Sequence, residues 1–329
     1  MKAIIKTSAL SLLAVTLSGC GGSSSSTTDA PQQQAPTTAK FSLGLSDAPV
    51  DDAQAVYIEL DSIKLINSDE SAANREILIE DFTDENGEIV ESIQVNLLDF
   101  QGSEQSKIID EAQNIELTNG NYRMELNVID SGSYVLLNKD ETKHAIKVPS
   151  GRLQLGEFAV SDQAVQIDDS PAYTVEFDLR QSLVLRGNSN NNNGFIVKPQ
   201  GVRIVSLSGD ITGTASGDLT NLGDCTVYLY DEQATEFADI YDANDENFVA
   251  PSTAITASAP LATSKVAADG TFAIGFVQAA SYKIAIHCSA DTDDNVQYDA
   301  LTIPYAADIT PEVQTITVNS GETTTVTFE

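Results

Sequence analysis

The chain has 329 residues, enough for two domains, and its 49 acidic residues against 17 basic ones give a formal charge of −32. This charge argues against nucleic acid or an anionic lipid surface as a partner of the folded part. Tryptophan is absent, which excludes the stacked tryptophan platforms of many sugar-binding sites, whereas cationic partners and divalent cations stay compatible.

Residues 1–19 have the layout of a secretory signal peptide. Two lysines open the segment, and the apolar run over residues 8–17 is too short to span a bilayer. Leu17-Ser18-Gly19-Cys20 resembles the lipobox of bacterial lipoproteins, which are cleaved just before the cysteine. The resemblance implies that Cys20 becomes a lipidated N-terminus, and Gly21 in place of Asp implies the outer membrane of a Gram-negative cell. The alternative is an ordinary cleaved signal with Cys20 as an incidental thiol.

Residues 20–40 comprise this cysteine and a tract rich in Gly, Ser, Thr, Pro and Gln. Because such a composition cannot bury apolar surface, we expect a flexible, disordered tether. A coil of about 20 residues has an r.m.s. span of roughly 25 Å. The tether would therefore keep the folded part near the membrane but clear of the lipid headgroups.

Residues 41–208 are predicted to form a first β-sandwich. Apolar residues alternate with polar or smaller ones, as half-buried antiparallel strands require, over 56–60, 122–128 and 173–179. Turn residues such as Asn119-Gly120 separate these stretches, and the asparagines over 190–193 predict a hairpin loop. The segment 103–114 is predicted as a short helix.

Several short motifs in this region carry a family resemblance. In chain order they are Leu45-Ser46-Asp47-Ala48-Pro49, Asn96-Leu97-Leu98, Gly120-Asn121-Tyr122, Val148-Pro149-Ser150-Gly151, Asp178 with Ser182-Leu183, and Lys198-Pro199. Together they resemble an uncharacterised domain family of bacterial lipoproteins, which implies a fold and a location but no catalytic residues. Pro49 and Asp47 are expected to form a turn, and an acidic ligand cluster of Asp47, Asp51 and Asp52 is the alternative.

Residues 209–329 are predicted to form a second β-sandwich, with alternation over 227–230 and 282–288. The stretch 263–287, with Asp269-Gly270-Thr271-Phe272 and Tyr282-Lys283-Ile284, resembles the transthyretin-like (carboxypeptidase regulatory-like) sandwich family. Ser281 departs from the glycine that this family usually has before the tyrosine. The resemblance implies a structural or interaction-bearing domain.

With Cys20 assigned to lipid, Cys225 and Cys288 remain as an even pair in an exported protein, which predicts a disulfide. Cys225 shares a strand face with Val227, and Cys288 shares one with Ile286, so both thiols should point into the core. Closing a loop of about 60 residues would stabilise the fold by roughly 4 kcal/mol. Two buried free thiols are the alternative.

Two acidic loops are the candidate metal sites, because clustered carboxylate oxygens can bind Ca²⁺. One contains Asp242 and Asp245, and the other contains Asp291, Asp293, Asp294 and Asp299. Because the disulfide would fix the two strand ends, we expect these loops at opposite ends of the sheet, where they could not build one site. Solvated loops without a cofactor are the main expectation, and a specific Ca²⁺ site in either loop is the alternative.

The sequence has no zinc-protease, nucleophile-elbow, P-loop or dinucleotide motif. His144 is expected to pack against the fold, and His287 is expected to be exposed. We therefore predict an all-β, non-enzymatic, lipid-anchored envelope protein with two antiparallel β-sandwich domains and a role in binding, adhesion or assembly. Its partners would be the membrane, through the lipid, and an envelope protein or glycan, but no nucleic acid. A carboxylate-based carbohydrate-active hydrolase and a Ca²⁺-dependent binding module are the alternatives.

Overall fold

A computed structural model describes residues 37–48, 53–138, 142–166, 170–188, 191–221, 224–289 and 293–329. Cys20, most of the predicted tether, Asp51, Asp52 and Asp291 lie outside these ranges, so the predictions for them stay predictions. Within the described ranges, no helix has the length and apolar character that crossing a membrane requires.

The described residues of the N-terminal region, between 37 and 206, form seventeen strands. They are β1 (Thr38–Lys40), β2 (Leu43–Ala48), β3 (Ala53–Asn67), β4 (Glu76–Ile79), β5 (Phe82–Thr83), β6 (Ile89–Val90), β7 (Ile93–Asn96), β8 (Ser106–Ile109), β9 (Glu116–Thr118), β10 (Gly120–Val128), β11 (Tyr134–Leu137), β12 (Lys143–Lys147), β13 (Arg152–Val160), β14 (Tyr173–Asp178), β15 (Leu183–Asn188), β16 (Asn191–Val197) and β17 (Val202–Ser206). The helical pieces are single turns: η1 (Leu97–Asp99), η2 (Glu111–Gln113), η3 (Asp130–Gly132), η4 (Pro149–Gly151) and α1 (Leu179–Ser182).

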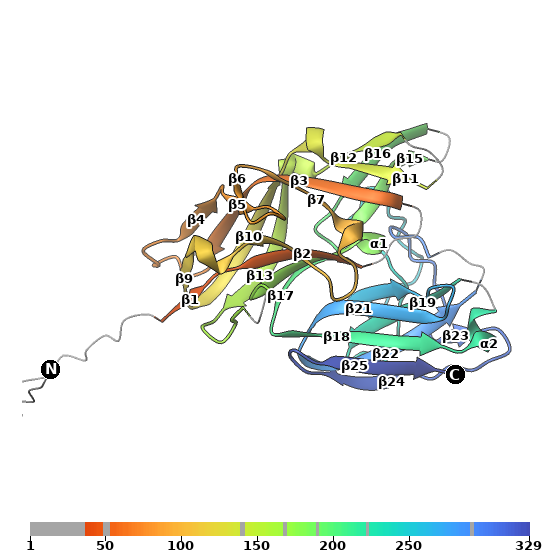
Figure 1. Ribbon diagram of the computed structural model, residues 1–329. Coiled ribbons are helices and arrows are strands. Elements are labelled where there is room, and N and C mark those ends of the chain that lie inside the picture. Colours follow the sequence, from red (N-terminus) through yellow and green to blue (C-terminus); the bar gives the residue numbers. More distant parts are fainter. Residues whose placement is uncertain are drawn as a thin grey trace, which may run out of the picture. The chain divides into compact units, whose positions relative to one another are not determined.

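Two sheets enclose the core of this region (Figure 1). The larger runs β13-β10-β3-β11-β12-β16-β15, with β4 and β7 also paired to β3, and the smaller runs β17-β14-β2-β8. Val56 and Leu126 of the larger sheet belong to the same buried cluster as Leu43 and Val175 of the smaller sheet. The alternation in the sequence thus gives each sheet one apolar face, and the two apolar faces meet.

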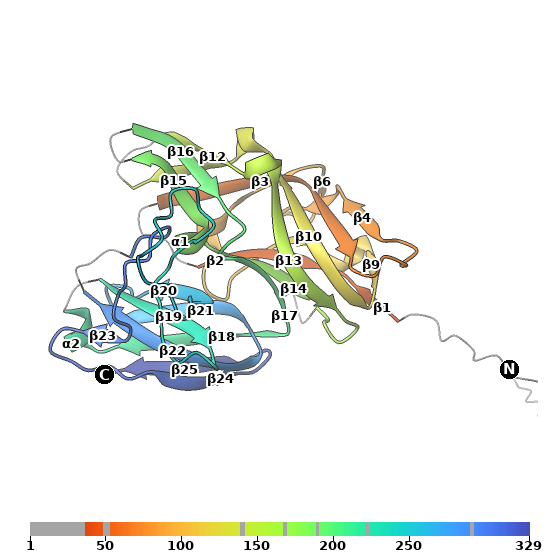
Figure 2. The ribbon, with the colours of Figure 1, turned by 180° about the vertical axis from the view of Figure 1, so that it is seen from behind.

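The C-terminal region, residues 208–329, contains β18 (Ser208–Ala215), α2 (Gly217–Thr220), β19 (Cys225–Asp231), β20 (Ala262–Lys265), β21 (Thr271–Gln278), β22 (Ala280–Cys288), β23 (Tyr305–Ala306), β24 (Gln314–Val318) and β25 (Thr323–Phe328). Its sheets run β21-β18-β25 and β20-β19-β22-β23, with β24 also paired to β22 (Figure 2). A second core, with Ile211 and Phe272 from one sheet and Val227 and Ile284 from the other, lies between them.

The prediction of an all-β fold is confirmed, with two differences in detail. Four strand pairs of the described residues are parallel, namely β2–β14, β12–β16, β18–β25 and β22–β23, so the sheets are mixed. Both regions belong to one compact unit, Pro36–Glu329. Separate cores form on either side of residue 208, and the predicted domain boundary there stays a prediction.

Three local predictions are corrected by the structure. The expected helix over 103–114 is the strand β8 followed by the single turn η2, because Ile108 and Ile109 are both fully buried and β8 pairs with β2. The expected tether ends before Thr38, because β1 pairs with β9 and buries Ala39. The asparagine run is not only a loop, since β16 begins at Asn191.

Two long loops of the C-terminal region pack on the outer face of β19 and β22. The β19–β20 loop covers residues 232–261, and the described part of the β22–β23 loop covers residues 293–304. They enclose a third, smaller core around Tyr228 and Tyr230. These loops carry the acidic residues that the sequence singles out.

Candidate functional site

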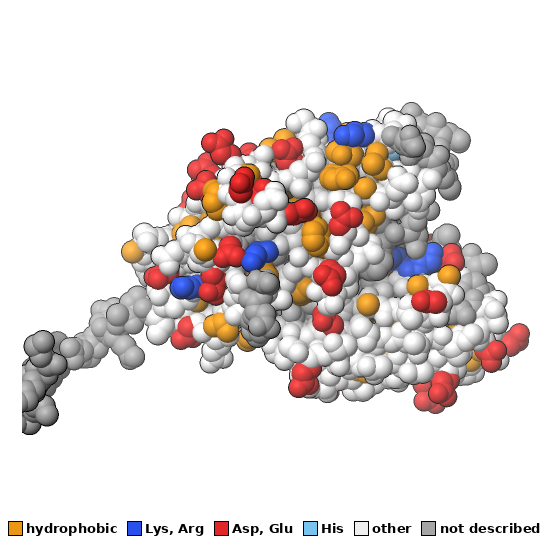
Figure 3. All heavy atoms as spheres, viewed as in Figure 1, with side chains coloured by type: hydrophobic (Ala, Val, Ile, Leu, Met, Phe, Trp, Pro, Cys, Tyr) orange, Lys and Arg blue, Asp and Glu red, His pale blue; other side chains and the backbone are white. Residues whose placement is uncertain are grey.

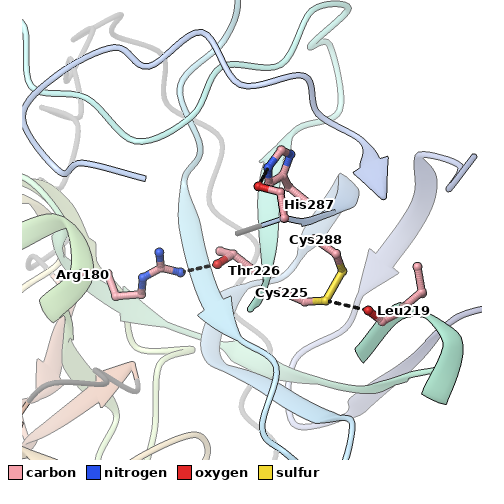
Figure 4. The surroundings of a disulfide bond; sticks show 7 residues. Arg180, Leu219, Cys225, Thr226, His287 and Cys288 are labelled. Atoms are coloured by element: carbon pink, nitrogen blue, oxygen red, sulfur yellow. Dashed lines mark hydrogen bonds between the residues drawn. A yellow bond between two sulfur atoms is a disulfide. The ribbon is translucent and has the colours of Figure 1, made fainter. Parts of the chain in front are cut away.

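Cys225 and Cys288 form a disulfide bond with an S–S distance of 2.03 Å. They lie directly opposite each other on antiparallel β19 and β22, with Cα atoms 4.1 Å apart, and both are buried. Figure 4 shows the bond beside Leu219, whose carbonyl oxygen is 3.5 Å from Sγ of Cys225. The predicted bond between two core-facing thiols is present in the structure.

His287, predicted to be exposed, is buried. Its Nδ1 lies 2.9 Å from the carbonyl oxygen of Thr302, and its Nε2 lies 3.0 Å from Oγ of Ser289. The prediction was wrong because strand alternation identifies the face that points away from the core but not the loop that covers that face. His144 is half-buried and packs edge-on against Phe195, as expected.

A lysine from the N-terminal region forms ion pairs with two carboxylates of the first acidic loop. Nζ of Lys198 lies 3.1 Å from Oδ2 of Asp242 and also contacts Oδ2 of Asp245. The exposed fractions of the three side chains are 16%, 7% and 5%. Because the ammonium occupies the position that a cation would take, the structure does not favour a Ca²⁺ site at these two carboxylates.

The carboxylates of the second acidic loop accept hydrogen bonds from the backbone of the same loop, from β19 and from the β19–β20 loop. Asp293 accepts hydrogen bonds from the hydroxyl of Tyr228, at 2.8 Å, and from the backbone N–H of Ile240, at 3.2 Å. Burial raises the pKa of Asp293 to about 7. This carboxyl is therefore a buried anchor for the loop.

Asp294 and Asp299 form a local turn. Oδ1 of Asp294 accepts the backbone N–H groups of Val296 and Gln297, and Oδ2 of Asp299 accepts the N–H of Asp294. These bonds explain the cluster of acidic residues in the sequence, since short carboxylates cap turns efficiently. Among the residues that the structure describes, no group of three or more His, Cys, Asp or Glu side chains is arranged to hold a metal ion.

The two acidic loops meet, contrary to the prediction that they lie at opposite ends of the sheet. The N–H of Asp242 donates to the carbonyl of Val296 at 3.1 Å, and Nε2 of Gln297 donates to the carbonyl of Asn247 at 2.9 Å. The strand ends are where the disulfide predicts them. The β19–β20 loop, however, is long enough to run back along β19 and reach the other end.

Glu176 was not predicted as a functional residue, because its place in the alternating pattern indicates an outward position on a half-buried strand. Every residue of β14 is buried, and Glu176 is fully buried. Burial raises the pKa of Glu176 to about 8, although the Arg203 guanidinium, 3.8 Å away, opposes the shift. Arg203 in turn donates to the carbonyl of Gly275 in the C-terminal region, at 3.1 Å.

Asp178, part of the motif set, joins the two regions. Its Oδ2 accepts three hydrogen bonds: from Nε2 of Gln181 at 2.8 Å, and from the N–H and the hydroxyl of Thr263 at 2.9 and 3.0 Å. Two residues further on, Arg180 donates to Oγ1 of Thr226 at 2.9 Å, which Figure 4 shows beside the disulfide. The motif therefore marks a buried polar joint between β14, α1 and the sheet of the C-terminal region.

A hollow of about 840 Å³ lies between the β15–β16 hairpin and the first acidic loop. Its lining is apolar at Val184, Leu185 and Ile196. It also carries a positive charge at Arg186 and a negative charge at Glu246. The ion pairs of Lys198 are part of its lining. This hollow is the candidate functional site, because it brings together the Lys198-Pro199 motif and the first acidic loop.

Residues 38–199 match a family model described as a domain of unknown function (DUF4382). The match agrees with the prediction of an uncharacterised family in this region, and it ends one residue after Lys198. A search of curated proteins finds no match to the chain. The resemblance of 263–287 to the transthyretin-like family stays a prediction.

Several solved structures show distant similarity. The Bacillus anthracis TIE protein has a TM-score of 0.19 and 12% identity, over 89% of this chain and 34% of that one, so this chain matches about a third of its length. The minor pilin GBS52 of Streptococcus agalactiae has a TM-score of 0.21 and 11% identity, over 87% and 94% of the two chains. The shaft pilin SpaA of Lactobacillus rhamnosus GG has a TM-score of 0.23 and 10% identity, over 89% and 97%. Scores this low carry no argument about fold or function.

Proposed function

We propose that this chain is a lipid-anchored cell-envelope protein whose folded part binds or assembles with a partner without catalysing a reaction. The observation that carries the proposal is the use of the carboxylates. Asp178 and Asp293 each accept a backbone N–H from a distant segment and so hold one segment against another, and Asp242 accepts the N–H of Asn244 within its own loop and pairs with Lys198. Carboxylates fixed in this way are structural, whereas a glycoside hydrolase needs two carboxyl groups that face a substrate.

The hollow beside the β15–β16 hairpin is the binding surface in this proposal. Leu185 on its wall is 38% exposed, and both signs of charge stand close to it. Apolar contact surrounded by charged groups is the usual composition of a binding patch. On the face in Figure 3, by contrast, acidic side chains are spread widely with few basic ones between them. An envelope protein or a glycan is the partner that we propose.

The anchor is the second part of the proposal. Lipid on Cys20, with two or more acyl chains, would hold the protein stably at the outer membrane. Metabolic labelling with a fatty acid tests this: wild type should incorporate label and sediment with membranes, and Cys20→Ala should do neither. Ser23→Ala, which leaves the lipobox intact, is the matched control. Membrane retention of Cys20→Ala equal to that of wild type would contradict the anchor.

The absence of catalysis is tested with the mature protein on a panel of glycans and hydrolase substrates, together with binding to purified envelope components. We expect saturable binding without turnover, weakened at least tenfold by Leu185→Glu. Leu207→Glu is the control, because Leu207 is exposed to the same degree, 40%, and does not line the hollow. Turnover that a single Asp or Glu substitution abolishes would overturn the proposal in favour of a hydrolase.

A further inference from the structure

We infer that Lys198 and Asp245 become joined by an intramolecular amide bond at the base of the hollow. The amine of Lys198 contacts the carboxyl of Asp245 directly, and Asp242 stands beside both, 3.1 Å from the same nitrogen. All three side chains are largely shielded from water, with exposed fractions of 16% or less. A nucleophile, an electrophile and a proton carrier are therefore gathered in one place that is partly shielded from water.

The geometry of the loop directs both carboxyl groups at the amine. Oδ1 of Asp242 accepts the N–H of Asn244 at 2.9 Å, and Oδ1 of Asp245 accepts the N–H of Asn247 at 2.6 Å. In each aspartate one oxygen is thus fixed by the backbone, and Oδ2 faces Lys198. The lysine is fixed as well, because its own N–H donates to the carbonyl of Ser182 at 2.9 Å. Such pre-orientation replaces an encounter between two groups with an intramolecular step.

The chemistry balances without a cofactor. In the first step a proton passes from the Lys198 ammonium to Oδ2 of Asp245, with which it is in direct contact. The nitrogen lone pair then attacks Cγ of Asp245, and the negative charge that develops on Oδ1 is stabilised by the N–H of Asn247. Asp242 takes one proton from the attacking nitrogen and delivers it to Oδ2 of Asp245. The Cγ–Oδ2 bond breaks, one water leaves, a C–N amide bond remains, and Asp242 returns to its starting state.

The bond would connect the two regions of the fold. Lys198 directly follows β16 of the N-terminal region, and Asp245 lies in the β19–β20 loop of the C-terminal region. A covalent link here would restrict the unfolded chain as a disulfide does, but a reducing agent would not break it. The inference does not depend on the proposed binding function, since the bond forms or fails whether or not the hollow has a partner.

Mass spectrometry of the full, reduced protein tests the inference. The protein should be lighter by one water than its sequence requires. Digestion after glutamate should leave peptides 177–232 and 237–246 joined as one branched species, and fragmentation should place the link at Lys198 and Asp245. Trypsin is unsuitable, because its peptides 187–203 and 204–265 adjoin, and a missed cleavage between them has the same mass as the cross-link. The full expected mass with two separate peptides would show an ion pair only and would overturn the inference.

Variants make the test specific. Lys198→Arg keeps the positive charge and the ion pair but offers no comparable nucleophile, so it should have the full mass. Asp242→Asn keeps the size but removes the proton carrier, so the branched species should form more slowly. The ion pair of Lys265 with Asp224, which is 82% exposed, is an internal control that should stay uncoupled in the same digest. A missing water that persists in Lys198→Arg would place any bond elsewhere and would also overturn the inference.

Discussion

Asp239 and Asp293 lie on two different loops, and each accepts a backbone N–H from the loop of the other. Oδ2 of Asp239 accepts the N–H of Leu301 at 2.7 Å, and Oδ1 of Asp293 accepts that of Ile240 at 3.2 Å. The exchange ties the β19–β20 and β22–β23 loops into one cover over the outer face of β19 and β22. Both carboxyl groups have raised pKa values, about 6 for Asp239 and about 7 for Asp293, and burial is the main cause in each case.

These raised pKa values predict a dependence of stability on pH. A carboxyl with a higher pKa in the folded than in the unfolded state contributes stability at low pH that is lost as pH rises through the folded pKa. Asp293→Asn removes the charge but keeps an acceptor for Ile240. We expect it to raise the free energy of unfolding by about 1–3 kcal/mol at pH 8 and to change it little at pH 4. Urea denaturation at both pH values measures this, and an equal effect at the two would contradict it.

Glu176 predicts a second, later transition. Its pKa is raised from an ordinary value of 4.5 to about 8, so the folded state loses stability progressively as pH rises from about 4.5 to 8, where the unfolded chain has released a proton that the folded chain still holds. Glu176→Gln should match wild type at pH 4 and melt several degrees higher at pH 9. Thermal melts over this range measure the difference. Glu157→Gln is the control, because Glu157 is exposed, and it should leave the pH profile unchanged.

Asp178→Ala should be one of the most damaging substitutions of an acidic residue. It removes the acceptor for both Thr263 donors and for Gln181, so buried polar groups lose their partner. We expect a loss of about 2–4 kcal/mol in the free energy of unfolding. Asp69→Ala is the matched control: Asp69 also accepts an N–H and a hydroxyl, both from Ser71, but it does so in an exposed turn. A loss of the same size in both variants would mean that Asp178 is not a buried joint.

Removal of the disulfide should destabilise the C-terminal region. Cys225 and Cys288 are separated by 63 positions, and closing a loop of that length contributes about 4 kcal/mol in the chain-entropy model. The double variant Cys225→Ala/Cys288→Ala should lose most of this in chemical denaturation. Wild type should show one linked peptide pair before reduction, and two alkylatable thiols in the unreduced protein would contradict the bond.

The sequence alone predicted the fold class and much of the secondary structure. Apolar alternation along β3, β10, β14, β19 and β22 is a local property, because a half-buried strand needs an apolar side chain at every second position. The same alternation oriented Cys225 and Cys288 toward a core, and the even count paired them. The motif around Asp178 and Lys198 was visible too, but only as a resemblance without a physical role.

Tertiary structure decided what the polar residues do. Asp242 and Asp245 are conspicuous in the sequence as Ca²⁺ candidates, yet the structure pairs them with Lys198, which is distant in sequence. Glu176 has the sequence position of an outward-facing residue, yet it is fully buried, because both faces of β14 are covered. The apolar alternation along a strand shows which of its faces points toward a core, but it says nothing about the opposite face. Which loop or sheet covers the other face depends on contacts between residues far apart in the chain, so the partners of these charges are set only when the whole chain has folded.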